Sequence, residues 1–108
     1  WHTVVCSEVL EHTYDPKLVL TNLSKVADCL IGTVPFLIGI HDAPEDYWRF
    51  TEFGLSYLFK QSSWRMIRIQ RFGAPYRTIL RQPWRLAFRH SQSERIPEGY
   101  GFVAIKIK

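Results

Sequence analysis

Apolar residues along the chain form short runs and one helical repeat that follow each other in a regular order. Residues 3–6 and 29–34 are apolar runs rich in β-branched side chains, which favour strands buried on both faces, as in parallel sheets. Between the two runs, apolar residues recur at helical spacing at Leu20, Leu23, Val26 and Ala27. Asp15-Pro16 marks the helix start, because aspartate caps free amides and proline fits the first helical position. The pattern predicts strand, helix, strand.

The rest of the pattern predicts one more helix and two more strands. Thr51 is the expected helix cap, and Phe53, Leu58 and Phe59 are expected to face a core. Residues 64–71 and 102–108 alternate with period two, and in the second of these strands either side can face inward. We interpret Gly99-Tyr100-Gly101 as a turn, because this pair of glycines precedes a strand and does not open a helix.

These elements favour an α/β fold in a single domain, residues 1–108. The length and a hydrophobic content of 46% suit one modest core. The sequence has neither a charged leader with a cleavage site nor an apolar run of about 18 residues, the minimum for a membrane span. Cys6 and Cys29 lie in apolar runs without metal or redox spacing, and we expect both to be buried thiols. The sequence therefore predicts a cytoplasmic protein.

Two motifs give the chain a family resemblance. The first is Val9-Leu10-Glu11-His12 followed by Asp15-Pro16, and the second is Pro35-Phe36 leading into His41-x-x-Pro44-x-Asp46-Tyr47-Trp48-Arg49-Phe50-Thr51. Together they resemble the C-terminal half of a class I S-adenosylmethionine-dependent methyltransferase, over roughly residues 1–73. The chain departs from that family at His2, where an acidic residue is common, and at Ala27-Asp28, which replaces a Lys-Pro-Gly-Gly turn. The family's glycine-rich cofactor loop has no counterpart in these residues.

The resemblance implies a partial Rossmann-like methyltransferase fold. The four strands would be strands four to seven of that fold, side by side in the order four, five, seven, six, with the last strand antiparallel. Right-handed crossovers would place both helices on one face of this mixed sheet. The other face and the edge at residues 3–6 would then need a cover. One candidate cover is the segment of residues 74–90, and the others are a second copy in a homodimer or the missing N-terminal half.

The resemblance also assigns residues to a site. Cys6, Ser7, Glu11 and His12 would border the cofactor, and His41, Asp46, Trp48 and Arg49 would bind the methyl acceptor. Such a place suits a ligand, because open α/β sheets bind ligands beyond the carboxyl ends of their strands. The full-length parent would use S-adenosylmethionine, whereas these 108 residues are not expected to bind it tightly.

Each of these residues also has an interpretation that does not depend on the family. Glu11 and His12 form a general acid and base pair, or they serve local structure. Asp46 bonds Arg49 or the loop backbone, with Trp48 and Phe50 packed inward. A metal site of His41, Asp42 and Asp46 is less favoured, because loop ligands without supporting groups are usually solvated. We therefore predict no metal.

Charge divides the chain into two halves. Residues 1–59 have a net charge of −5 and residues 60–108 a net charge of +9, which together give +4. Within the basic half, residues 74–90 form an insert in which arginines recur every four residues, at Arg77, Arg81, Arg85 and Arg89. This spacing predicts an amphipathic helix, which Pro83 would kink. A solvated basic face is the simplest interpretation; peripheral membrane contact is an alternative, and nucleic-acid binding is less favoured.

The sequence thus leaves two functions open. The first is the C-terminal half of a methyltransferase, inactive by itself because it lacks the glycine-rich loop. The second is a noncatalytic interaction or dimerisation module derived from that fold.

Overall fold

A computed structural model describes residues 1–73 and 97–108 of the chain. The predicted basic insert, residues 74–90, and its four arginines lie outside the described residues. Within the described part, no helix combines the length and the apolar character that crossing a membrane requires.

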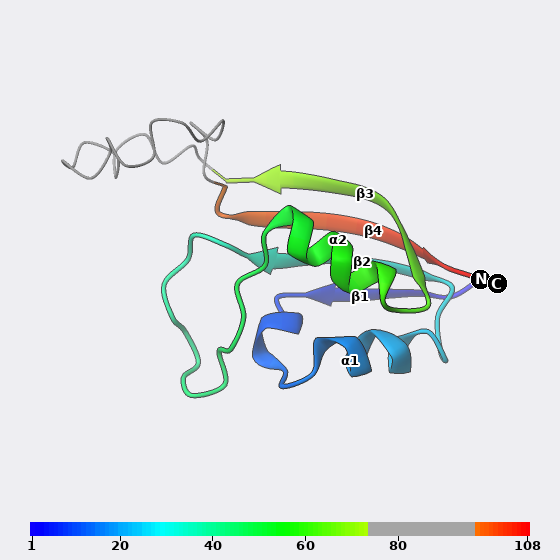
Figure 1. The fold of residues 1–108 in the computed structure, drawn as a ribbon, viewed down its shortest axis with the longest axis horizontal. Coiled ribbons are helices and arrows are strands. Elements are labelled where there is room, and N and C mark those ends of the chain that lie inside the picture. Colours follow the sequence, from blue (N-terminus) through cyan, green and yellow to red (C-terminus); the bar gives the residue numbers. More distant parts are fainter. Residues whose placement is uncertain (74–96) are drawn as a thin grey trace.

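The centre of the fold is a four-stranded mixed sheet. Its strands are β1 (Thr3–Ser7), β2 (Cys29–Pro35), β3 (Trp64–Phe72) and β4 (Gly99–Lys106). They lie in the order β1-β2-β4-β3 (Figure 1). β1 and β2 are parallel, and β4 is antiparallel to both of its neighbours. The predicted α/β class with a mixed sheet is confirmed.

Two helices and one 3₁₀ turn connect these strands. The turn is η1 (Leu10–His12), and the helices are α1 (Pro16–Leu23) and α2 (Glu52–Lys60). Asp15 caps α1, since its Oδ1 accepts the amide of Leu18 at 3.0 Å. Thr51 caps α2, since its Oγ1 accepts the amide of Gly54 at 3.0 Å. Both predicted helix starts are confirmed.

The cap of α1 gives a first testable prediction. Asp15→Ala should lower the free energy of unfolding by about 1 kcal/mol, because the substitution leaves a helix amide without its acceptor. Lys17→Ala, an exposed change in the same helix, is the matched control and should change stability by about 0.5 kcal/mol or less. Urea unfolding of both variants measures the difference, and equal losses would argue against the cap.

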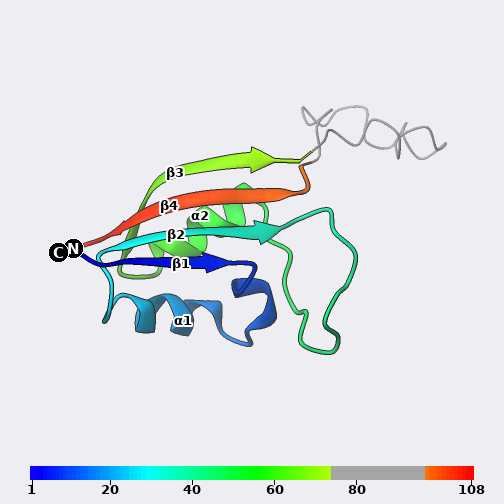
Figure 2. The same cartoon turned by 180° about the vertical axis from the view of Figure 1, so that it is seen from behind.

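A single core lies on one face of the sheet. α2 lies over that face in Figure 1 and behind the strands in Figure 2, and α1 runs along β1 and contacts α2. The helices contribute Leu20, Leu55 and Phe59, which pack with inward residues of the strands. Trp64 joins the two layers, because its buried indole NH donates to the carbonyl of Leu20 at 2.8 Å. Both helices therefore bury their apolar sides in the same core.

The opposite face and the β1 edge are open among the described residues. Val5 of β1 is 73% exposed and Ile31 of β2 is 42% exposed, although both are apolar strand residues. β1 pairs only with β2 in the described sheet. Exposed edges of this kind are available for pairing with another chain.

The interpretation of Gly99-Tyr100-Gly101 as a turn was wrong. These residues belong to β4, where Gly99 pairs with Pro35 on one side and with Phe72 on the other. A Cβ atom at Gly99 would lie 2.3 Å from the carbonyl oxygen of Val34. Glycine serves here to let two strands approach closely, and not to reverse the chain.

Three apolar residues also differ from their predicted positions. Phe53 is 79% exposed, and Leu55 takes the core position of the first turn of α2. Val26 lies beyond the end of α1 and is exposed. The alternation predicted for residues 64–71 is interrupted by an irregularity between Met66 and Arg68, which leaves Ile67 exposed. A bulge of this kind inserts one extra residue and exchanges the two sides of a strand.

Candidate functional site

The predicted site residues gather where β1 and β2 end. η1 follows β1, and the loop of residues 36–51 follows β2, so both lie at the same end of the sheet (Figure 1). The loop is attached to η1 by the amides of Tyr47 and Trp48, which donate to the carbonyl of Glu11 at 2.8 and 3.2 Å. Residues far apart in the sequence thereby meet beyond the carboxyl ends of two parallel strands.

An ion pair between Asp46 and Arg49 holds this loop in shape. Nη1 and Nη2 of Arg49 donate to the two oxygens of Asp46 at 2.6 and 2.9 Å. The Asp46 carboxylate, almost fully buried, also accepts the amide of His41 at 2.9 Å, and Arg49 reaches the carbonyl of Gly39 at 3.2 Å. The hydrogen bonds from Arg49 and His41 hold the pKa of Asp46 well below its usual range. The interpretation in which Asp46 bonds Arg49 is confirmed.

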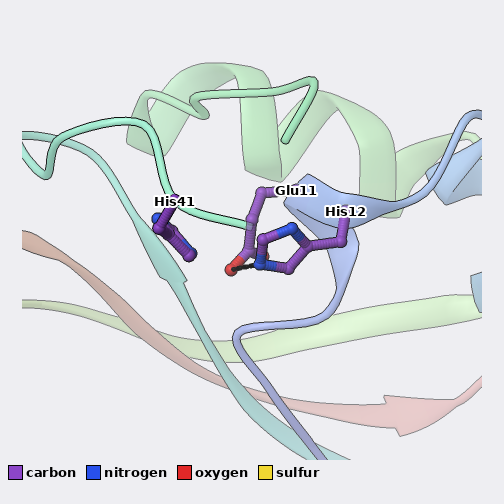
Figure 3. Close-up of side chains that lie close together, drawn as sticks. All are labelled: Glu11, His12 and His41. Atoms are coloured by element: carbon purple, nitrogen blue, oxygen red, sulfur yellow. Dashed lines mark ion pairs between the residues drawn. The ribbon is translucent and has the colours of Figure 1, made fainter. Parts of the chain in front are cut away.

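Three side chains with potential chemistry meet beside this loop. Figure 3 shows the imidazoles of His12 and His41 turned toward the carboxylate of Glu11. One ligating atom from each residue lies within 4.8 Å of the others. Nε2 of His12 is 3.6 Å from Oε1 of Glu11, and the two imidazole rings meet edge to face with centroids 4.8 Å apart. We call Glu11, His12 and His41 the EHH cluster.

Burial and local charges set the protonation of the EHH cluster. Glu11 is fully buried, and this burial, aided by the carboxylate of Glu8, raises its pKa to about 7, whereas His12 lowers it. The pKa of His12 is raised, mainly because its ring bonds the carbonyl of Glu45 and also because Glu11 is near. A buried carboxyl group with a pKa of about 7 and an imidazole 3.6 Å from it are able to exchange a proton at this site.

Cys6 and Ser7 lie on opposite faces of β1. Cys6 is buried in the core, and burial together with the charge of Glu11 raises its pKa to about 11. Ser7 is exposed, and its hydroxyl hydrogen bonds that of Thr33 at 2.8 Å. Cys29 is only partly buried, so the expectation of two buried thiols holds for Cys6 alone. The cofactor role of Cys6 and Ser7 remains a prediction.

Trp48 and Phe50 stack on each other with different exposure. Their ring centroids are 6.5 Å apart, but Phe50 is buried and Trp48 is 43% exposed. The indole NH of Trp48 donates to the carbonyl of Thr13 at 2.7 Å, which fixes the ring. The inward packing expected of both residues is confirmed for Phe50 and was wrong for Trp48. A half-exposed aromatic ring on the same loop as His41 remains available to a ligand.

Sequence reasoning missed two features of this site. It assigned Glu11 and His12 to the cofactor and His41 to the methyl acceptor, whereas the structure joins the three side chains in one cluster. It also considered a metal site of His41, Asp42 and Asp46, but Arg49 engages both oxygens of Asp46. The signal that could have found the cluster is the shared edge at which two parallel strands end.

A further missed contact lies between two tyrosines. Tyr14 follows η1 and stacks on Tyr47 of the loop with ring centroids 4.6 Å apart, which adds a second link between the two segments. The nearby Tyr14 hydroxyl raises the pKa of Tyr47 to about 12, so its phenol stays protonated at physiological pH. Neither tyrosine stands out by spacing alone.

Comparison with known proteins found neither a family model nor a curated protein that matches this chain. The resemblance to methyltransferases therefore remains a prediction from the two sequence motifs.

Proposed function

We propose that this chain supplies the acceptor side of a class I S-adenosylmethionine-dependent methyltransferase domain. The order β1-β2-β4-β3, with β4 antiparallel, supports its assignment as strands four, five, seven and six of that fold. The observation that carries the proposal is the meeting of both family motifs, through Glu11, His12 and His41, beyond the carboxyl ends of β1 and β2.

The chemistry of methyl transfer is compatible with a domain in which one half binds the cofactor and the other half binds the acceptor. The sulfonium cofactor supplies the reactive methyl group, and the protein contributes mainly the alignment of an acceptor with it. The acceptor would lie among Trp48, His41 and the carboxyl end of β1, where Glu11 and His12 are able to take a proton from a hydroxyl or amine. The open face and the β1 edge would pack against the half that carries the glycine-rich loop.

Isothermal titration with S-adenosylmethionine tests this proposal on two forms of the protein. One is the 108-residue chain, and the other is the product of the same gene extended by its upstream coding sequence. We expect saturable binding to the extended product only. Low-micromolar binding to the 108 residues alone, or no binding to the extended product, would overturn the proposal.

A second candidate function is a dimerisation module that carries out no chemistry. The exposure of Val5 and Ile31 on the open face favours it, because a second copy would bury this surface. Sedimentation equilibrium at micromolar concentration should then show a dimer that Val5→Lys converts to a monomer. Glu45→Lys, a change on the site loop away from this face, is the control. A monomeric unsubstituted chain would reject this candidate.

A further inference from the structure

The starting observation is a buried carboxylate without a hydrogen-bond partner, whose only ion-pair contact among the described residues is His12 at 3.6 Å. Glu11 has no exposed surface, and neither of its side-chain oxygens has a hydrogen-bond partner among residues 1–73 and 97–108. Buried carboxylates are ordinarily paired with a cation or hydrogen bonded, because removing a charge from water is costly. Arg49, the cation of the neighbouring loop, is already bound to Asp46. Glu11 therefore lies at a place where a positive charge would be stabilised.

The two histidines beside Glu11 are oriented as metal ligands usually are. Nδ1 of His12 contacts the carbonyl of Glu45, and Nδ1 of His41 contacts the carbonyl of Gly39 at 3.1 Å. A carbonyl oxygen only accepts, so each Nδ1 carries the hydrogen and each neutral ring keeps its lone pair on Nε2. Metal-bound histidines are commonly fixed in this way, with the second nitrogen donating to a carbonyl or carboxylate.

These observations concern side chains from two separate segments. Glu11 and His12 belong to η1, whereas His41 belongs to the loop after β2. The amide of His41 donates to Asp46 of the same loop, which holds His41 in place. We propose that the EHH cluster binds a divalent transition-metal cation, with Zn²⁺ as the probe ion. Two imidazoles and one carboxylate are a donor set that Zn²⁺ accepts and that Fe²⁺, Mn²⁺ and Co²⁺ share.

The distances require only a modest closure. In tetrahedral zinc sites with bonds of about 2.0 to 2.1 Å, ligand atoms lie about 3.3 Å apart. Nε2 of His12 and Oε1 of Glu11 are already 3.6 Å apart, and one ligating atom from each of the three residues lies within 4.8 Å of the other two. Both imidazoles are partly exposed, so a small shift of each ring that keeps its Nδ1 on the backbone carbonyl is able to bring the ligating atoms together. Their exposed side leaves coordination positions for water or for an oxygen atom of a bound molecule.

This inference depends on the geometry of the cluster and not on methyl transfer. It also replaces the expectation of no metal. That expectation considered only ligands from the loop, namely His41, Asp42 and Asp46, and did not include the buried Glu11. Asp46, a ligand in that earlier set, accepts the amide of His41 and binds Arg49, so it positions His41 and does not bind the metal.

Metal titration of tag-free protein, stripped beforehand with a chelator, tests the proposal. Isothermal titration should show one equivalent of Zn²⁺ bound in the micromolar range or tighter. Glu11→Gln and His41→Ala should each weaken binding by about 100-fold or more, because each removes a ligand. His2→Ala, which removes an exposed histidine far from the cluster along the chain, is the matched control and should leave the affinity unchanged.

Co²⁺ provides a second readout that distinguishes this cluster from the two cysteines. The bound ion should show ligand-field bands without thiolate charge-transfer absorption, because the ligands are nitrogen and oxygen atoms. If Glu11→Gln fails to fold, His41→Ala decides the result. The absence of saturable binding, an affinity unchanged in His41→Ala, or a thiolate spectrum would each overturn the proposal. These results are independent of cofactor binding, so they leave the proposed methyltransferase function to its own titration.

Discussion

Asp46→Ala is expected to lower the free energy of unfolding by about 3 kcal/mol, because it removes one partner of a nearly buried ion pair. Arg49 would lose two hydrogen bonds to the carboxylate, and the amide of His41 would lose its acceptor. Urea unfolding at neutral pH, followed by tryptophan fluorescence, measures the loss.

The matched control for this variant is Glu45→Ala. Glu45 is the preceding carboxylate of the same loop, but its side chain is exposed. Surface substitutions of this kind change stability by about 0.5 kcal/mol or less. Similar losses in the two variants would mean that Asp46 and Arg49 do not hold the loop.

Glu11→Gln is expected to stabilise the metal-free chain at alkaline pH. The pKa of Glu11 rises from an ordinary value of 4.5 to about 7 on folding, mainly through burial. Between these two values the folded state binds more protons than the unfolded state, so stability falls as the pH rises. A shift of this size corresponds to about 3 kcal/mol at pH values above 7, at 1.36 kcal/mol per pKa unit.

The amide of glutamine removes this dependence without changing the shape of the side chain. In a chelator-containing buffer, the variant should equal the unsubstituted chain near pH 4 and exceed it by about 3 kcal/mol near pH 8. Glu45→Gln, the same substitution at an exposed position of the site loop, is the control and should show no such difference. A stability difference for Glu11→Gln that does not change with pH would contradict the burial of a charged Glu11.

Local signals predicted the helix starts and the first three strands closely, whereas β4 begins three residues earlier than predicted. Asp15 and Thr51 each accept a hydrogen bond from an amide three residues further along the chain, so their effect is visible in the sequence. The apolar runs of β1 and β2 are similarly local. The α/β class followed from the order of these elements.

Features that depend on distant contacts were not predictable in this way. Gly99 appeared to be part of a turn, because its reason for being glycine is the carbonyl of Val34 on another strand. Phe53 appeared to be a core residue, but the way α2 rests on the sheet gives that place to Leu55. Both errors arise where tertiary packing overrides local preference.

The candidate site shows the same division. The pairing of Asp46 with Arg49 spans three residues and could be anticipated, whereas the approach of His41 to Glu11 depends on how the loop after β2 returns to η1. The same loop also covers Glu11, because the amides of Tyr47 and Trp48 donate hydrogen bonds to the carbonyl of Glu11. The sequence therefore singled out Glu11, His12 and His41 but not their meeting in one cluster.

The measurement that bears most directly on the proposed function is the titration of S-adenosylmethionine into the 108-residue chain and into the longer product of the same gene. A half-domain that provides only the acceptor side predicts measurable binding to the longer product and none at low-micromolar concentration to the shorter one. Tight binding of S-adenosylmethionine to the shorter chain, or no binding to either protein, would contradict the proposed function.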